Sequence, residues 1–413
     1  MADGPAPAGA GPLAGLRVLD LTLAMAGPMC TQRLAEMGAD VIKVEAPGGG
    51  DFSRAATMGG VTGFGDGICF VALNRAKRSL VVDLKRPEGR EAVLALARGA
   101  DVLVQNYRPG VAARLGVDHA SLAPIAPRLV YGSISGYGED GPMAARPGQD
   151  LLLQAFSGLT FNGGVEGGLP QASPLYMVDV TASHMLCEGI LAALLERSVT
   201  GRGREVRVSM LGAIMEMQAQ EVTAFLASPA PPRRSRAPQV SIWQEPPYGL
   251  HACRTGVLAI AQADLAVLAE ALDLPVLAGL KAARPADADA EALAAWRDRV
   301  VEAVAARLRE KDAAHWDALL APRGVWCMVA NDYAAFLAHP QAAAVLTDME
   351  HPRMGRYRTV APGIRFPDGP PAPLAPPPAY GAHSREVLAE AGLDAARIDA
   401  LVASGVVVTE DGR

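Results

Sequence analysis

The sequence predicts an α/β fold in which a doubly wound, mostly parallel, Rossmann-like sheet is joined to a second, smaller α+β domain. Short apolar runs alternate with helical segments through the first half of the chain, and this alternation is typical of such a sheet. The composition then changes to alanine-rich amphipathic helices, which indicates the second domain. At 413 residues, the chain also exceeds the size at which a single hydrophobic core stops growing.

The sheet is expected to begin with a strand over residues 17–21, a helix over 28–37 and a strand over 40–45. Elements this close in sequence form a βαβ unit, whose two strands are parallel. The loop over residues 23–28 leaves the carboxyl end of the first strand, which is where open α/β sheets bind ligands.

The pattern then repeats, with strands expected over residues 79–84, 101–105 and 128–133. A helix that opens at Pro87 and ends near Gly99 joins the first two of these strands. Polar and glycine-containing loops follow the strands, so these loops should meet at one edge of the sheet.

Asp179 lies between two valines at the point where a loop becomes a helix that should end at Gly201. The unpaired N–H groups and the positive end of the helix dipole favour an anion at a helix N-terminus. We therefore expect Asp179 to be ionised and available to react. The alternative interpretation is a helix cap, a role in which aspartate is common.

Five sequence regions are expected. A disordered tail covers residues 1–12, and a large α/β domain covers 13–226 and is completed by 350–413. A small domain at 244–335 lies between linkers at 227–243 and 336–349. The further expected elements are a strand at 204–211, helices at 210–225, 288–309, 334–346, 384–391 and 395–404, a hairpin at 248–261, and a proline-rich extended segment at 361–380.

Composition restricts the classes of partner. The net charge is -6 and long runs of Lys or Arg are absent, which argues against nucleic acid or an anionic membrane as partner. The five cysteines include no C-x-x-C pair, so the sequence predicts neither a disulfide framework nor a zinc site. Without a signal-peptide pattern or 18 consecutive apolar residues, a soluble, cytoplasmic protein is expected.

Several familiar motifs are missing. The loop after the first strand offers only Gly27 instead of G-x-G-x-x-G, which argues against a nicotinamide enzyme. G-x-S-x-G, phosphate-loop and H-E-x-x-H motifs do not occur. His184 lies near Asp179, but a packing or surface role is the simpler interpretation. These exclusions leave a reaction that a carboxylate side chain carries out.

Many short blocks nevertheless occur together in an informative order. They are GLRVLDL (15–21), AGPMCTQ (26–32), GADVIKVE (38–45), NRAKRSL (74–80), DLKRPEG (83–89), ADVLVQN (100–106), SGYG (135–138), RPGQD (146–150), TGRG (200–203) and EVLAEAGL (386–393). In these blocks the chain resembles the class III CoA-transferase family, the formyl-CoA transferase and carnitine CoA-transferase group that also contains α-methylacyl-CoA racemase.

The resemblance implies that Asp179 is a nucleophile that carries CoA from an acyl-CoA donor to a carboxylic acid through anhydride and thioester intermediates. It implies no metal and no cofactor beyond coenzyme A as substrate. It also implies an interlocked homodimer. The CoA contacts that it implies in the large domain are Ala24, Met25, Ala26, Val82, Lys85, Asn106, Tyr107, Arg114, Leu115 and Arg146.

Two alternatives remain at this point. A racemase needs two acid/base groups, and the resembled racemases have a histidine where this chain has Gln149, so transfer is favoured. A non-catalytic CoA-binding protein is the second alternative. The sequence does not name the substrates, and a small dicarboxylate with succinyl-CoA as donor is the default expectation.

Overall fold

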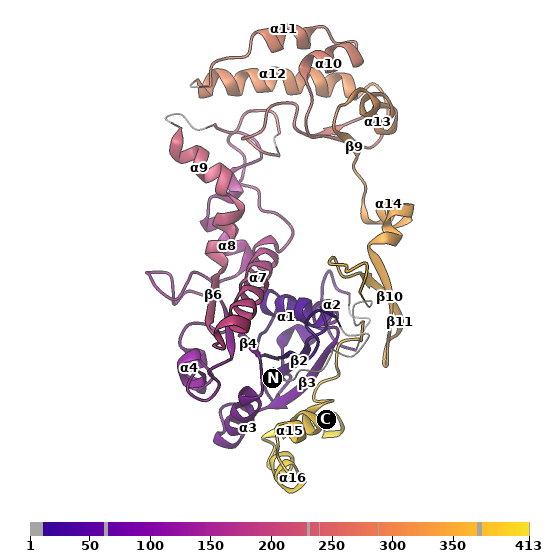
Figure 1. The fold of residues 1–413 in the computed structure, drawn as a ribbon. Helices are drawn as coiled ribbons and strands as arrows, with labels where there is room; N and C mark the ends of the chain where they lie inside the picture. Colours follow the sequence, from indigo (N-terminus) through magenta and orange to yellow (C-terminus); the bar gives the residue numbers. More distant parts are fainter. Residues whose placement is uncertain are drawn as a thin grey trace. The chain divides into compact units, whose positions relative to one another are not determined.

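The computed structural model describes residues 11–61, 65–228, 232–238, 240–287, 289–369 and 374–412. The chain divides into two compact units (Figure 1). The first contains Met1–Leu153, Tyr176–Ile214 and Gln341–Arg413, and the second contains Gln154–Leu175 and Met215–Pro340. The domain and linker boundaries expected from sequence stay a prediction, because a unit defined by contacts does not have to fold alone.

The first unit is built on a seven-stranded sheet with the order β12-β3-β2-β1-β4-β5-β6. All neighbouring strands are parallel except β12 and β3, which confirms the mostly parallel α/β sheet. The parallel strands follow the order typical of doubly wound folds. Their bounds are β1 (Arg17–Asp20), β2 (Asp40–Glu45), β3 (Lys77–Val82), β4 (Val102–Gln105), β5 (Val130–Ser135), β6 (Glu205–Ser209) and β12 (Val407–Val408).

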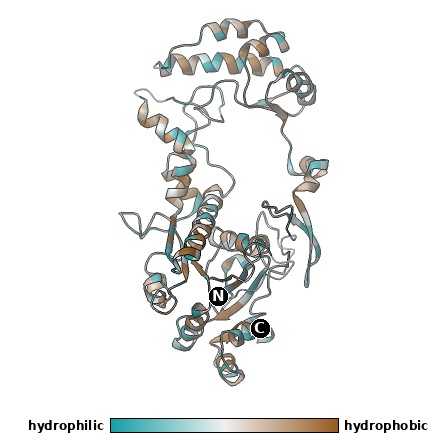
Figure 2. Cartoon of the chain, viewed as in Figure 1, coloured by the Kyte–Doolittle hydropathy of each residue, from teal (hydrophilic) through white to brown (hydrophobic). Residues whose placement is uncertain are grey.

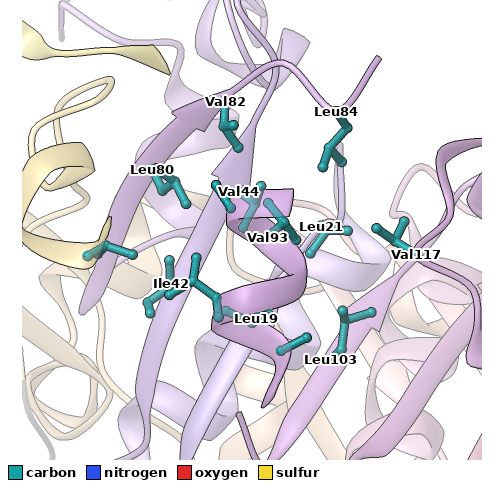
Figure 3. Close-up of a cluster of buried hydrophobic side chains, with 14 of the residues drawn as sticks. Leu19, Leu21, Ile42, Val44, Leu80, Val82, Leu84, Val93, Leu103 and Val117 are labelled. Carbon is teal, nitrogen blue, oxygen red and sulfur yellow. The ribbon is translucent and has the colours of Figure 1, made fainter. Parts of the chain in front are cut away.

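One face of this sheet carries the main apolar core of the unit. Alternate strand residues such as Leu19, Ile42, Leu80 and Leu103 point into it, together with Val93 of α3 (Figure 3). Residues of the last two helices belong to the same cluster. The helices that contribute are α3 (Pro87–Arg98), α4 (Val111–Leu115), α5 (His119–Leu122), α15 (Ser384–Glu390) and α16 (Ala395–Ala403).

Helix α7 (Met177–Thr200) packs against α1 (Ala26–Glu36) and against strands β5 and β6. It ends at Gly201, which has a left-handed φ of 71°, as the sequence predicts. Its length and its mean hydropathy of 1.4 over 18 residues would also suit a membrane span. Its packing against the sheet is that of a core helix. Two shorter helices of this unit are α2 (Ile68–Leu73) and α6 (Asp150–Phe156), the latter ending in the second unit.

The second unit contains a three-stranded antiparallel sheet and a helical layer around buried Trp296 and Trp316. Hydrophilic and hydrophobic residues alternate along α12 (Figure 2), so one side of this helix can enter the core. The expected hairpin and the helix at 288–309 are confirmed. The bounds are β7 (Gly249–Ala252), β8 (Val257–Ile260), β9 (Cys327–Val329), α10 (Leu265–Ala271), α11 (Val276–Ala282), α12 (Ala290–Leu308) and α13 (Ala313–Leu320).

Two segments that were expected to form single helices do not do so: one helix is shorter than expected and the other is divided. The helix at 334–346 is replaced by α14 (Tyr333–Ala338), because Pro340 disfavours helical geometry in the residue before it. An antiparallel hairpin of β10 (Leu346–His351) and β11 (Gly355–Val360) follows. The helix at 210–225 is divided at Gln218 into α8 (Met210–Met217) and α9 (Ala219–Ala227). Of the extended segment at 361–380, residues 370–373 lie outside the described residues.

Candidate active site

Asp179 lies in the first turn of α7 and is half-buried. The N-cap position is Tyr176, which makes no capping bond through its side chain. The carboxylate of Asp150 caps the helix instead: its Oδ2 atom accepts hydrogen bonds from the N–H groups of Val178, at 2.7 Å, and Asp179, at 3.1 Å. The interpretation of Asp179 as a helix cap is therefore wrong, and its carboxylate is left for another role.

Asp150 is the functional residue that the sequence interpretation missed. It begins α6, it is 1% exposed, and it reaches the start of a helix that begins 27 residues later in the chain. Such a cap cannot be inferred from local spacing, because capping patterns relate residues three positions apart. The one available signal was its place at the end of the RPGQD block.

The pKa of Asp179 is raised to about 6. Burial is the largest cause, and the negative charge of Asp150 adds to it, whereas a hydrogen bond from the backbone N–H of Ala26 acts in the opposite direction. From the sequence, unpaired N–H groups at the start of α7 are expected to favour the ionised form of Asp179, but Asp150 accepts hydrogen bonds from two of these groups. At pH 7, which is above this pKa, the carboxylate of Asp179 is still mostly ionised.

The loop between β1 and α1 brings Ala26 to Asp179. Ala24 has a left-handed φ of 67°, which is uncommon for a residue other than glycine. Position 27 has room only for glycine, because a Cβ atom there would lie 2.3 Å from the Cβ of Thr22. The predicted CoA contacts Ala24, Met25 and Ala26 thus belong to a tight turn at the carboxyl edge of the sheet.

Asn106 and Tyr107 follow β4 at the same edge. The side-chain amide of Asn106 bonds both backbone groups of Leu23, each at 2.8 Å, and so joins the β4 loop to the β1 loop. Tyr107 packs against the apolar core, and burial raises its pKa to about 12. Both residues are tied to the protein itself, and their contact with CoA stays a prediction.

The remaining predicted contacts differ in exposure. Val82, at the end of β3, is buried in the core cluster, and Leu115 of α4 packs against that cluster. Lys85, Arg114 and Arg146 are exposed and follow β3, β4 and β5 respectively. The three cations therefore lie on connections that leave the carboxyl ends of β3, β4 and β5, of which β4 and β5 are neighbours in the sheet. Their role in binding phosphates stays a prediction.

Two clefts occur away from Asp179. A cleft of about 370 Å³ is lined by Tyr107 and Tyr131 together with four carboxylates and two arginines. Its acidic residues, Asp118, Glu139, Asp140 and Glu205, make it unsuitable for the phosphates of CoA. The second cleft, of about 520 Å³, lies within the second unit beside Trp243. Asp179 lines neither cleft.

In the part of the chain that the structure describes, no group of three His, Cys, Asp or Glu side chains is arranged to hold a metal ion. His184 of α7 is half-buried, and burial followed by the charge of Arg33 lowers its pKa. The imidazole is therefore neutral at pH 7.

Comparison with known proteins gives a consistent result. The sequence profile described as CoA-transferase family III matches residues 13–384. Succinyl-CoA:glutarate CoA-transferase of Mus musculus is 32% identical over 96% of this chain and 90% of its own length. Succinate--glutarate CoA-transferase of Agrobacterium fabrum is 32% identical over 92% and 95%. The crystal structure of a CAIB/BAIF family protein from Brucella suis has a TM-score of 0.75 at 29% identity, covering 92% of this chain and all of that one.

Proposed function

Since the chain belongs to CoA-transferase family III and is an acyl-CoA:carboxylate CoA-transferase, we propose that it transfers CoA through covalent intermediates on Asp179. The observation that carries this proposal is the state of the Asp179 carboxylate. It is half-buried, it is released from capping by Asp150, and it is faced by the N–H of Ala26. A raised pKa makes this carboxylate a stronger nucleophile than an exposed aspartate while it remains ionised at pH 7.

The first half of the reaction moves CoA onto the enzyme. The carboxylate of Asp179 attacks the thioester carbonyl of the donor, so that a C–O bond forms, the C–S bond breaks and CoA leaves as a thiolate. The thiolate then attacks the Asp179 carbonyl of this mixed anhydride. The donor acid leaves as a carboxylate, and an aspartyl-CoA thioester remains.

The second half reverses these steps with the acceptor. The acceptor carboxylate attacks the aspartyl thioester and releases CoA thiolate, which attacks the acceptor carbonyl of the second anhydride and restores Asp179. Protons and electrons balance without another reactant. Each attack creates an oxyanion, for which the N–H of Ala26 is a candidate donor.

For the substrates, we propose succinyl-CoA as donor and a small dicarboxylate as acceptor. The support is that the mouse and Agrobacterium relatives named above are called succinyl-CoA:glutarate and succinate--glutarate CoA-transferases over almost their whole lengths. Lys85, Arg114 and Arg146 are proposed to bind the phosphates of CoA, since guanidinium and ammonium groups form charge-assisted hydrogen bonds with phosphate.

A homodimer in the cytoplasm is also part of the proposal. Several large apolar side chains are exposed in the single chain, among them Leu195 and Val199 of α7, at 72% and 86%, and Tyr333 of α14, at 80%. Exposed apolar surface of this kind is typical of a surface that another chain covers. Sedimentation of the purified protein would measure the assembly directly.

The reaction is tested by incubating the enzyme with succinyl-CoA and a panel of carboxylic acids, and separating the products by chromatography. New acyl-CoA peaks for a dicarboxylate such as glutarate are expected. Loss of chirality at a 2-methylacyl-CoA without transfer would instead indicate racemisation. CoA binding without any turnover would indicate a non-catalytic protein, and either result would contradict the proposal.

A further inference from the structure

Side chains from four separate segments hold the backbone of the loop between β1 and α1. Five consecutive backbone polar groups, from the N–H of Thr22 to the N–H of Ala24, are all bonded in this way. Asp20 accepts from the N–H of Thr22 and Lys43 donates to its carbonyl, both at 2.9 Å. Asn106 binds both groups of Leu23, and Asp51 accepts from the N–H of Ala24 at 3.2 Å.

Lys43 is the least expected member of this set, because its side chain is fully buried in β2. Its Nζ atom lies 3.0 Å from Oδ2 of Asp51, which is also fully buried. Burial alone would lower the pKa of Lys43, but the charges of Asp20, Asp51 and Glu45 raise it instead. The ammonium is therefore charged, and it connects the carbonyl of Thr22 to the carboxylate that holds Ala24.

Asp51 binds the backbone of two segments that are far apart in sequence. Its Oδ1 atom accepts hydrogen bonds from the N–H groups of Ala24 and of Ser53, the latter at 2.9 Å in the short 3-10 helix Phe52–Arg54. Ala24 keeps its left-handed φ of 67° while bonded in this way. A non-glycine residue persists in such a conformation only where surrounding contacts determine it. Two residues later, Ala26 begins α1, which packs against α7, the helix that carries Asp179. The backbone N–H of Ala26 lowers the pKa of Asp179.

We propose that Lys43 and Asp51 are positioning residues, which hold the β1–α1 loop so that the backbone N–H of Ala26 faces the carboxylate of Asp179. This inference rests on the proposed role of Asp179 as nucleophile. Neither Lys43 nor Asp51 contacts a substrate in this proposal. Stability alone gives a poor account of a buried ion pair, because the cost of desolvating two charges offsets much of their attraction. A function for the loop that the pair holds accounts for it better.

The test is the pH dependence of kcat/KM, whose acidic limb reports the ionisation of the essential carboxylate in the free enzyme. In the wild type we expect a midpoint near pH 6, the pKa of Asp179. Loss of the Ala26 N–H bond raises the pKa of Asp179. Lys43→Met and Asp51→Ala should therefore move the midpoint upward by about one pH unit. Asp150, whose charge also acts on Asp179, is unchanged in both variants.

Two further variants separate positioning from general damage. Asp51→Asn keeps an oxygen that can accept from Ala24 and should retain most of the wild-type midpoint. Arg75→Met removes a different buried ion pair, with Glu36 at 2.6 Å at the far end of α1, and should lower the melting temperature without moving the midpoint.

If Lys43→Met and Asp51→Ala do not fold, Asn106→Ala provides a third loop variant. It removes the hydrogen bonds to Leu23 without leaving a buried charge unpaired, and it should move the midpoint in the same direction.

The outcomes distinguish the two proposals. The positioning role would be overturned if the folded loop variants kept the wild-type midpoint of kcat/KM, or if Arg75→Met shifted that midpoint equally. Either result would leave the proposed nucleophile in place as long as Asp179→Ala is inactive. Full turnover in Asp179→Ala would instead overturn the proposed nucleophile, whatever the loop variants show.

Discussion

Two carboxylates of the first unit have pKa values that are shifted in opposite directions. Asp20 is fully buried beneath the β1–α1 loop, and Asp179 is half-buried at the start of α7. Burial alone would raise the pKa of Asp20, but the positive charges of Lys77 and Lys43 hold it well below its usual range. At Asp179, burial and the negative charge of Asp150 raise the pKa to about 6.

Burial raises the pKa of both carboxylates, and the neighbouring cations reverse this effect at Asp20, whereas the like charge of Asp150 adds to it at Asp179. Asp20 is bonded to Lys77 at 2.8 Å and to the hydroxyl groups of Thr22 and Thr31, so its lone pairs are used within the protein. At Asp179 the backbone N–H of Ala26 lowers the pKa, and the like charge of Asp150 raises it. The first arrangement holds a loop in place, and the second leaves a carboxylate that can attack a thioester.

Replacing the reactive carboxylate gives the largest expected effect. Asp179→Ala should lower kcat by at least ~10³-fold, because the covalent intermediates cannot form. CoA should still bind, since the proposed phosphate contacts lie on other elements. Steady-state kinetics with succinyl-CoA and isothermal titration with CoA measure the two quantities. Turnover within a few-fold of the wild type would contradict the account.

Replacing the paired carboxylate should cost stability. Asp20→Leu leaves Lys77 buried without its anion and should lower the free energy of unfolding by ~3–5 kcal/mol. Urea denaturation measures this loss. Burial lowers the pKa of Lys77 to about 8 although the charge of Asp20 raises it, so the pKa of Lys77 falls further when Asp20 is replaced. The loss should therefore shrink as the pH rises toward 8, because the uncompensated ammonium of the variant then loses its proton, and a pH-independent loss would contradict the charge argument.

Asp179→Asn should instead raise the free energy of unfolding. A carboxylate whose folded pKa is raised costs stability above that pKa, and the cost disappears as the pH falls through about 6 toward the unfolded value. At pH 7.5 the variant should be more stable than the wild type by ~1–3 kcal/mol. Thermal unfolding at pH 7.5 and at pH 4 measures this, and equal stabilisation at both values would show that the gain is not electrostatic.

The smallest effect is expected at Asp150. Asp150→Asn keeps an oxygen for the N–H groups of Val178 and Asp179 but removes the negative charge that raises the pKa of Asp179. The acidic limb of kcat/KM should move downward by ~0.5–1 pH unit. Asp40→Asn, in the surface ion pairs of Arg17 and Arg78, is the matched control and should leave the limb in place. A limb that stays near pH 6 in Asp150→Asn would show that burial alone sets the pKa.

Much of the sheet was predictable, because parallel strands buried on both faces occur as short apolar runs. Strands β1 and β2 and helix α7 lie close to their expected positions. The two-residue strand β12 is too short to give a pattern, and the polar sequence of β10 does not resemble a strand. The prediction of a helix at 334–346 was wrong because the alanine-rich composition favours a helix there, whereas Pro340 interrupts it.

The candidate site was predictable only in part. The position of Asp179 followed from family resemblance and from its place at a helix start. Its raised pKa was not predictable, because burial, which is the largest cause, and the effects of Asp150 and Ala26 all arise from packing of segments that are far apart in sequence. Lys43 was hidden for a similar reason: nothing in a strand pattern shows that a lysine is buried against an aspartate of a later loop.

The central claim is that Asp179 carries the acyl group and then CoA. Its most direct test is to mix the enzyme with succinyl-CoA, trap with hydroxylamine and map the modified peptide by mass spectrometry. The account predicts a hydroxamate on Asp179 that requires the donor and is absent from Asp179→Asn. Turnover under the same conditions with an unmodified Asp179 peptide would contradict it.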